Sequence, residues 1–230
     1  MDKKKNLFLY CLMAAAFLGI LVTGVLYGCP VYRMIPLCVS LMVMILQTRA
    51  NRATFLLGGI NALYYAVVYF SLKLYGMSLY SLLVACPLQL LTWWRWRKNA
   101  YAQATVLRRL TGRQRLRWGL GLAGAWLGLY LLLDAFGSGY LILDNTISII
   151  STAGNLGSVL SLIEFPFAQI LAHVLNITLY VQMVVEDPAQ WPFLIFFSYA
   201  LICSSISAWF MHKLYRKQRR EAGKPSATAG

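Results

Sequence analysis

Apolar runs of about twenty residues recur along this chain, and a helix needs about 20 such residues to cross a bilayer. Lipid offers no hydrogen-bonding partner to backbone N–H and C=O groups, so runs of this length fold as helices. Only 12% of the 230 residues are charged, against about 25% in a soluble domain. The sequence therefore predicts an all-α polytopic membrane protein. Its eight expected transmembrane helices are residues 7–27, 31–47, 53–72, 77–94, 116–133, 141–160, 165–185 and 191–211.

The net charge of +14 falls mostly on one side of these helices. When the N-terminus is placed in the cytoplasm, 19 of the 21 Lys and Arg residues lie in cytoplasmic segments, and only Arg33 and Lys73 lie outside. Cytoplasmic loops carry such an excess of Lys and Arg. Both termini are therefore expected in the cytoplasm. The cytoplasmic set is Lys3, Lys4, Lys5, Arg49, Arg52, Arg95, Arg97, Lys98, Arg108, Arg109, Arg113, Arg115, Arg117, Lys213, Arg216, Lys217, Arg219, Arg220 and Lys224.

The stretch TWWRWRKN, residues 92–99, combines three tryptophans with three cationic side chains. Basic and aromatic residues together occur in nucleic-acid-binding proteins, and they also collect where a transmembrane helix reaches the headgroup layer. This stretch ends the expected span 77–94 on the side that carries the other basic residues. We therefore interpret it as a contact with the lipid bilayer, and we expect no nucleic acid partner.

The sequence carries no pattern typical of an enzyme or a metal site. The five cysteines lie in or beside apolar runs, with no CxxC pair and no histidine cluster, which is typical of small buried residues. No nucleophile–base pair, ATP-binding motif or metal-ligand spacing is recognisable. The sequence therefore predicts no enzyme activity, no cofactor and no metal. The cysteines are Cys11, Cys29, Cys38, Cys86 and Cys203.

Two of the expected spans share a polar pattern. Asn61 and Tyr65 are four residues apart in the third span, as are Asn176 and Tyr180 in the seventh. Residues at this spacing lie on one face of a helix. A tryptophan follows at a similar distance in each half, so we interpret spans two to four and six to eight as parallel copies. A linking span must then lie between them, in the 3+1+3 order of SWEET transporters.

The paired asparagines are the candidate solute site. An asparagine in hydrocarbon needs hydrogen-bonding partners, and its amide supplies both a donor and an acceptor. A helix–helix hydrogen bond would satisfy Asn61 or Asn176 taken singly. At equivalent positions of two repeats, the pair favours a shared site for a neutral solute with hydroxyl or amide groups. A membrane receptor or assembly protein without transport activity is the alternative class.

A longer stretch is similar to a known family. Residues 55–96, FLLGGINALYYAVVYFSLKLYGMSLYSLLVACPLQLLTWWRW, resemble the PnuC-type nicotinamide riboside transporters in their Gly-x-x-Asn helix, their Leu-Tyr at the outer turn and their closing Trp-x-x-Trp. In the second half, LDNTISIISTAGNLGSVLSLIE resembles the family's Asp-initiated span, with Asp144 near its start and Glu164 at its end. Asn176 matches the asparagine of the following helix.

The resemblance implies a 3+1+3 core in the bacterial cytoplasmic membrane, preceded by an extra N-terminal helix. It also implies facilitated diffusion of a vitamin precursor, for which nicotinamide riboside is the best candidate. A separate cytoplasmic kinase would trap this solute by phosphorylation. The chain departs from the family where two tryptophans are expected before the second asparagine. Depending on register, their positions hold Gln169 and Ala172, or Pro166 and Gln169. Thiamine, riboflavin and other nucleosides therefore stay open as alternative substrates.

The candidate substrate-binding residues combine polar and aromatic side chains. The asparagines are expected to bind the polar part of the solute, and the aromatic residues to form walls, or, for Trp93 and Trp96, a gate at the inner interface. His173 is either a neutral hydrogen-bonded residue or a proton relay. Asp144 is expected at a helix start, where a carboxylate accepts from exposed N–H groups. The set is Asn61, Asn176, Trp93, Trp96, Tyr65, Tyr180, Gln89, Gln169 and His173.

The sequence divides into five expected segments. The run 7–27 follows three lysines but lacks a small-residue cleavage site, so residues 1–28 are interpreted as an extra transmembrane helix rather than a signal peptide. Residues 29–98 form the first repeat and 99–140 a basic cytoplasmic loop with the linking helix. Residues 141–213 form the second repeat and 214–230 a basic cytoplasmic tail. Assembly as a homo-oligomer is left open.

Overall fold

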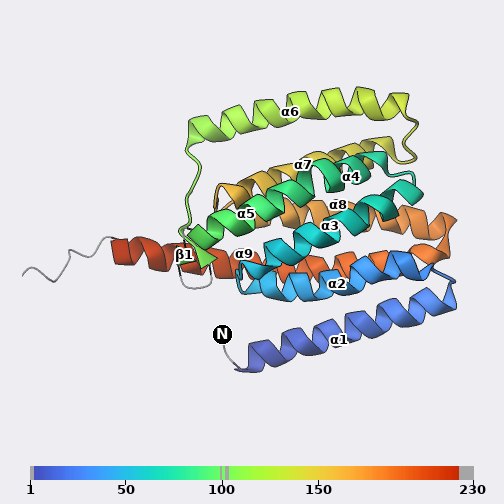
Figure 1. Ribbon diagram of the computed structural model, residues 1–230, viewed down its shortest axis with the longest axis horizontal. Helices are drawn as coiled ribbons and strands as arrows, with labels where there is room; N and C mark the ends of the chain where they lie inside the picture. Colours follow the sequence, from blue (N-terminus) through green and yellow to red (C-terminus); the bar gives the residue numbers. More distant parts are fainter. Residues whose placement is uncertain (1–2, 99, 102–103, 223–230) are drawn as a thin grey trace, which may run out of the picture.

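Long helices run side by side through the molecule (Figure 1). The computed structural model describes residues 3–98, 100–101 and 104–222. Within this part, seven helical segments are long and apolar enough to cross a membrane, which confirms the predicted all-α polytopic architecture. The elements are α1 (Lys3–Leu26), α2 (Val31–Thr48), α3 (Ala53–Ser71), α4 (Tyr75–Leu79), the π-helix η1 (Tyr80–Ala85), α5 (Cys86–Lys98), β1 (Ala100–Tyr101), β2 (Ala104–Thr105), α6 (Gly112–Ala135), α7 (Leu141–Val159), α8 (Phe165–Glu186), the 3-10 helix η2 (Pro188–Gln190) and α9 (Trp191–Ala222).

The helix α7 lies among these segments but is more polar than they are. It was expected as an eighth span, yet it is not one of the seven apolar segments found in the described chain. Its buried residues include Asp144, Asn145 and Asn155. Because it packs against α5, α6 and α8, these polar groups face other helices rather than lipid.

The fourth crossing segment is irregular where its sequence carries a proline. The π-helix η1 separates α4 from α5, and Pro87 is the second residue of α5. Pro87 has no N–H to bond to the carbonyl of Leu83, and its ring crowds that carbonyl. A π-turn, with its wider i→i+5 pattern, accommodates this local disruption. The expected regular span 77–94 is therefore two α-helical pieces joined by a wider turn.

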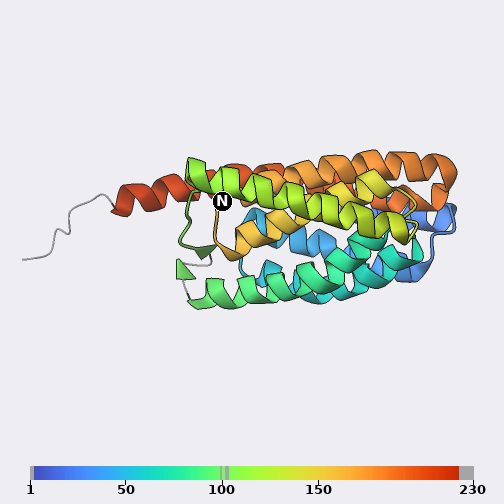
Figure 2. The same ribbon diagram turned by 90° about the horizontal axis from the view of Figure 1, so that it is seen from above.

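Two helices stand at the periphery of the bundle (Figures 1 and 2). On one side α1 packs on α2 and α9, and on the other α6 packs mainly on α7. The indole of Trp126 on α6 donates to Thr146 at 3.0 Å, and Asn145 donates back to the Trp126 carbonyl at 2.9 Å. The helix α6 begins before the predicted residue 116 because Thr111 and Gln114 form a capping box.

The segment between α5 and α6 is tied to the second half of the chain. The side chain of Gln218 on α9 accepts from the Leu107 amide and donates to the Thr105 carbonyl, both at 2.9 Å. The backbone of Arg108 donates to the carbonyl of Ser161, in the turn between α7 and α8, also at 2.9 Å. Residues 105–108 of the basic loop are therefore held against the second half of the chain at this end of the bundle.

The last helix continues well beyond the predicted span. The sequence predicted a crossing segment that stops at residue 211, whereas α9 runs to Ala222. Charged residues continue the helix outside the apolar region, and Lys217 and Glu221 form an i,i+4 ion pair at 3.8 Å. The predicted tail 214–230 is thus helical as far as it is described, and Lys224 lies outside the described residues.

The start of α1, the strand β1 and the end of α9 lie at one end of the bundle (Figure 1). The charge distribution predicts that this end faces the cytoplasm. In a variant without native cysteines, Val106→Cys and Arg220→Cys should resist a membrane-impermeant thiol reagent in intact cells, whereas Phe136→Cys should react. All three side chains are exposed in the described structure. If Val106→Cys and Arg220→Cys react and Phe136→Cys does not, the protein has the opposite orientation to the predicted one.

Candidate solute site

A cavity of about 170 Å³ lies inside the helix bundle. One buried water needs only about 15 Å³ of such volume, so the cavity has room for a small solute. Its walls come from α2, α3, α4, η1 and α5 of the first half and from α7, α8 and α9 of the second. The described residues that line it include no Lys, Arg, Asp or Glu. The arrangement suits a solute that needs hydrogen bonds rather than a counter-charge.

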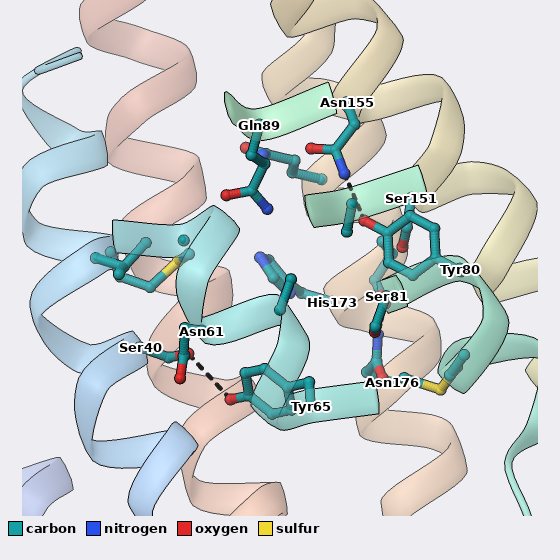
Figure 3. Close-up of a pocket in the computed structure, with 18 of the residues that line it drawn as sticks. Ser40, Asn61, Tyr65, Tyr80, Ser81, Gln89, Ser151, Asn155, His173 and Asn176 are labelled. Carbon is teal, nitrogen blue, oxygen red and sulfur yellow. Dashed lines mark hydrogen bonds between the residues drawn. The ribbon is translucent and has the colours of Figure 1, made fainter. Parts of the chain in front are cut away.

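Six of the nine residues predicted from the sequence line this cavity. They come from both halves of the chain, and Figure 3 shows five of them among the side chains around the pocket. His173 lies in the middle of that view, with Gln89 and Tyr65 on either side of it. The structure therefore brings together residues that are more than one hundred positions apart. The six are Asn61, Tyr65, Gln89, Gln169, His173 and Asn176.

The tryptophans of the predicted aromatic wall lie beyond one end of the cavity. Trp96 is buried, with its ring 4.7 Å from Phe55 and 6.3 Å from Phe165, and its indole donates to the Ser158 carbonyl at 3.0 Å. Trp93 packs against the same cluster. Phe55 itself lines the cavity. The two tryptophans therefore sit behind the wall, where Trp96 joins the first half to α7.

Tyr180 also lies behind the cavity wall. Its ring stacks on Phe193 at 4.8 Å and on Phe197 at 5.3 Å, and of these three only Phe197 is part of the lining. Tyr65, its counterpart in the first half, instead faces the cavity and shares a hydrogen bond of 3.0 Å with Ser40. Neighbouring aromatic residues on α9 thus place the two tyrosines differently although their sequence spacing is the same.

Each asparagine of the cavity uses its amide nitrogen within the protein. Asn61 donates to the Pro36 carbonyl at 2.9 Å and to the Ser40 hydroxyl at 2.8 Å. Asn176 donates to the Ala172 carbonyl at 2.8 Å, and its Oδ1 has no partner among the described residues. Asn155 donates to the Tyr80 hydroxyl at 2.8 Å. Asn61 thus uses both N–H hydrogens and has its oxygen left for a solute, whereas Asn176 and Asn155 have an oxygen and one N–H hydrogen left.

His173 is partly buried, and both of its ring nitrogens are buried and unbonded among the described residues. Its ring is tilted against Phe197 at a centroid distance of 6.0 Å. The sequence offered two interpretations, a proton relay or a neutral histidine held by a hydrogen bond. The described structure supplies no such hydrogen bond. Since buried polar atoms are nearly always paired, the free nitrogens indicate a solute or water as their partner.

Three glutamines gather toward the end of the cavity where the tryptophans lie. Gln47 on α2 donates to Gln169 on α8, which joins the two halves. Gln89 on α5 lies against Gly58 on α3, so closely that a Cβ at residue 58 would collide with the Gln89 amide. Glycine at this position therefore lets the amide reach the cavity. Gln47 was not among the residues predicted from the sequence.

Other lining residues were also missed by the sequence patterns. Tyr80 and Ser81 belong to the π-helix, which no periodicity indicated. Ser151 and Asn155 are on α7. On that helix, polar residues at 144, 148, 151, 155 and 158 follow the three- and four-residue spacing of one helix face. This polar stripe is a signal that could have located the α7 wall.

Asp144 joins the two halves at the opposite end of α7 from Trp96. Its fully buried carboxylate accepts from the backbone N–H of Gly76 at 2.8 Å, from that of Met77 at 2.7 Å and from the Ser138 hydroxyl at 2.8 Å. The carboxylate was expected to meet N–H groups at the start of its own helix. It instead caps α4, since the α3–α4 turn brings those N–H groups beside it.

Long apolar helices around a polar cavity, lined from both halves of the chain, define a membrane protein that can hold a small solute between its helices. The chain belongs to the nicotinamide mononucleotide transporter family, whose model matches residues 31–213. The predicted relationship to PnuC-type proteins is confirmed. This is a family of transporters, so the prediction that the chain is not an enzyme is confirmed as well.

The fold is that of a solved transporter. The chain matches the crystal structure of the vitamin B3 transporter PnuC with a TM-score of 0.79 and 19% sequence identity. The match covers 95% of this chain and 94% of that one, so it includes α1 as well as the core. A search of curated proteins finds no match to the sequence.

Proposed function

We propose that this protein carries nicotinamide riboside across the bacterial cytoplasmic membrane by facilitated diffusion through the central cavity. The observation that carries the proposal is a polar but uncharged lining drawn from both halves of the chain. Two parallel three-helix units, α2–α5 and α7–α9, with α6 as their link, would move relative to each other around the bound solute. Both termini would face the cytoplasm.

The charge of the lining favours the riboside over the mononucleotide. A phosphate monoester carries nearly two negative charges at neutral pH, and proteins bind such groups with Arg or Lys. The described lining has neither. Nicotinamide riboside has hydroxyl and carboxamide groups and one pyridinium charge. The aromatic rings of Tyr65 and Phe197 can stabilise that cation through their faces.

The lining also favours transport without an energy source. Coupling to sodium requires an anionic site, and the described lining contains no carboxylate; coupling to protons would have to act through His173. The sequence has no ATP-binding motif. Net uptake would then come from a cytoplasmic kinase that phosphorylates the riboside, since the product no longer fits an uncharged cavity. Assembly as a homo-oligomer stays a prediction.

Uptake into proteoliposomes tests this proposal. Nicotinamide riboside should enter until its internal and external concentrations are equal in the absence of a voltage, and nicotinamide mononucleotide should not enter. An imposed proton or sodium gradient should not raise the internal concentration further. Because the riboside is a cation, voltage must be clamped with potassium and valinomycin in every arm.

Competition identifies the solute class in the same vesicles. Excess unlabelled nicotinamide riboside should block entry of the labelled compound, whereas thiamine and riboflavin should not. Accumulation above the external concentration under a proton gradient, abolished by His173→Ala, would replace facilitated diffusion with proton coupling. Entry of the mononucleotide at the rate of the riboside would overturn the argument from the uncharged lining.

A further inference from the structure

We propose that a second pocket, at the basic end of the bundle, holds the headgroup of an anionic membrane phospholipid. This pocket has a volume of about 240 Å³. It lies between the segment that precedes α6, the start of α6, the α7–α8 turn, the start of α8 and the charged part of α9. None of its described lining residues also lines the central cavity, so the lipid site is separate from the proposed path of the solute.

Three side chains of this pocket can donate hydrogen bonds to a phosphate group. Arg109 precedes α6, Arg115 is at its start, and His212 is on α9. The side chains of Arg109 and His212 have no hydrogen bond or ion pair among the described residues. Guanidinium groups bind phosphate oxygens, and an imidazole can donate a ring N–H. The pocket therefore offers unused donors from two segments that are about one hundred residues apart.

The pocket also contains a carboxylate, that of Glu164, which is engaged by the protein itself. Its Oε1 accepts from the Arg115 guanidinium at 2.9 Å and from the Leu110 amide at 3.3 Å, and its Oε2 is buried. Glu164 therefore holds the start of α6 against the α7–α8 turn. Arg115 keeps further N–H groups beyond this contact, because a guanidinium has five. The charge of Arg109 has no acidic partner in the described structure.

An exposed apolar face of α8 begins at the pocket. Phe167 lines the pocket, and Leu171, Val174, Val181 and Val185 follow it at intervals that place them on the same side of the helix. Of these five side chains, Val174 is the least exposed at 43% and Val185 the most at 82%. In a bilayer such a face lies against acyl chains. A phospholipid fits both features, its headgroup in the pocket and its chains along α8.

Trp209 indicates the depth of the pocket in the bilayer. It lies one turn before His212 on α9, is 52% exposed, and has the ammonium of Lys213 at 5.4 Å from its ring centre. Exposed tryptophans collect in the headgroup layer, so the pocket lies at the level of the lipid phosphates. Basic pockets between transmembrane helices on the cytoplasmic side bind anionic headgroups. Charge and position together therefore favour a membrane lipid over a soluble phosphate.

Native mass spectrometry of the full-length protein in detergent micelles tests this site, because it resolves single bound lipids. Phosphatidylglycerol should bind the wild-type protein at least about fivefold more tightly than phosphatidylcholine, which has the same acyl chains but no net charge. Glycerol phosphate, which has a phosphate but no acyl chains, should not displace the bound lipid when present at the same concentration.

Variants assign the binding to the pocket. Arg109→Gln breaks no hydrogen bond of the described structure and should weaken binding of phosphatidylglycerol about fivefold, the contribution of one cation near the membrane surface. His212→Gln should weaken it as well. Arg113→Gln is the matched control, since Arg113 is exposed, lies at the start of α6 and is not part of the pocket. It should keep the wild-type affinity.

Three outcomes would overturn the lipid site. If Arg113→Gln weakens binding as much as Arg109→Gln, the lipid is attracted to the basic end as a whole and not to the pocket. Equal binding of phosphatidylglycerol and phosphatidylcholine would remove the role of charge. Displacement by glycerol phosphate would assign the pocket to a soluble anion. No transported solute enters these measurements, so their result is independent of the proposed function.

Discussion

Asp144→Ala is expected to lower the unfolding free energy of this protein by about 2–6 kcal/mol. The substitution leaves the buried N–H groups of Gly76 and Met77 without an acceptor, and each such group costs about 1–3 kcal/mol. It also frees the Ser138 hydroxyl and removes the contact that ties α7 to the start of α4. The measurement is denaturant or thermal unfolding of the purified protein in detergent.

Three further variants show whether the loss comes from this cap. Asp144→Asn keeps one amide oxygen and should recover part of the lost stability. Ser138→Ala removes a single hydrogen bond and should cost only about 1 kcal/mol. Gly76→Ala should destabilise the same joint, because a Cβ there would lie 2.7 Å from a Leu133 methyl carbon. If Asp144→Ala proves as stable as the wild-type protein, water must replace the carboxylate at the start of α4.

Asn61→Leu and Asn176→Leu are each expected to weaken binding of nicotinamide riboside by roughly five- to 150-fold. Leucine has a similar size but cannot accept a hydrogen bond, so one donor of the solute stays unpaired at about 1–3 kcal/mol. Isothermal titration calorimetry on the purified variants measures the change. Thr178→Val is the control on α8, because Thr178 is exposed, bonds only to the Val174 carbonyl and lies outside the cavity lining. It should bind nicotinamide riboside as the wild-type protein does.

The double variant tests whether the asparagines act on one solute. If both asparagines contact the same bound molecule, the variant that carries Asn61→Leu and Asn176→Leu together should show no detectable binding of nicotinamide riboside at millimolar concentrations. Each variant must elute as a folded species and keep its thermal midpoint within a few degrees of wild type. Unchanged affinity in both single variants would leave the two residues with a role in helix packing alone.

The positions of most helices follow from the sequence because the bilayer sets their length. The expected spans 31–47, 53–72 and 165–185 differ by one residue from α2, α3 and α8, since an apolar run ends where the hydrocarbon ends. The α9 extension was missed because hydropathy does not report a helix that continues into water. The early start of α6 was missed because the Thr111–Gln114 capping box acts through local hydrogen bonds that an apolar average does not contain.

The site is less predictable than the helices because it depends on how each helix is rotated. A helix that is apolar all round gives no direction for its few polar residues. Asn61 and Asn176 were found because their amides need partners in hydrocarbon. Tyr180 lies four residues after Asn176, and Trp96 lies in the same half of the chain as Asn61, yet their rings pack beside Phe193 and Phe55 outside the cavity. Such packing depends on residues distant in the chain.

The π-helix between α4 and α5 follows the wider i→i+5 pattern, so its turn holds about one residue more than an α-turn. Removing one residue within Tyr80–Ala85 would let the stretch close into regular α-helix. The rest of α5 would keep nearly the same face toward the bundle, with Gln89 at the cavity and Trp96 bonded to Ser158. The change would instead fall on Tyr80 and Ser81, so the length of this stretch shapes one part of the cavity wall and leaves the helix beyond it in place.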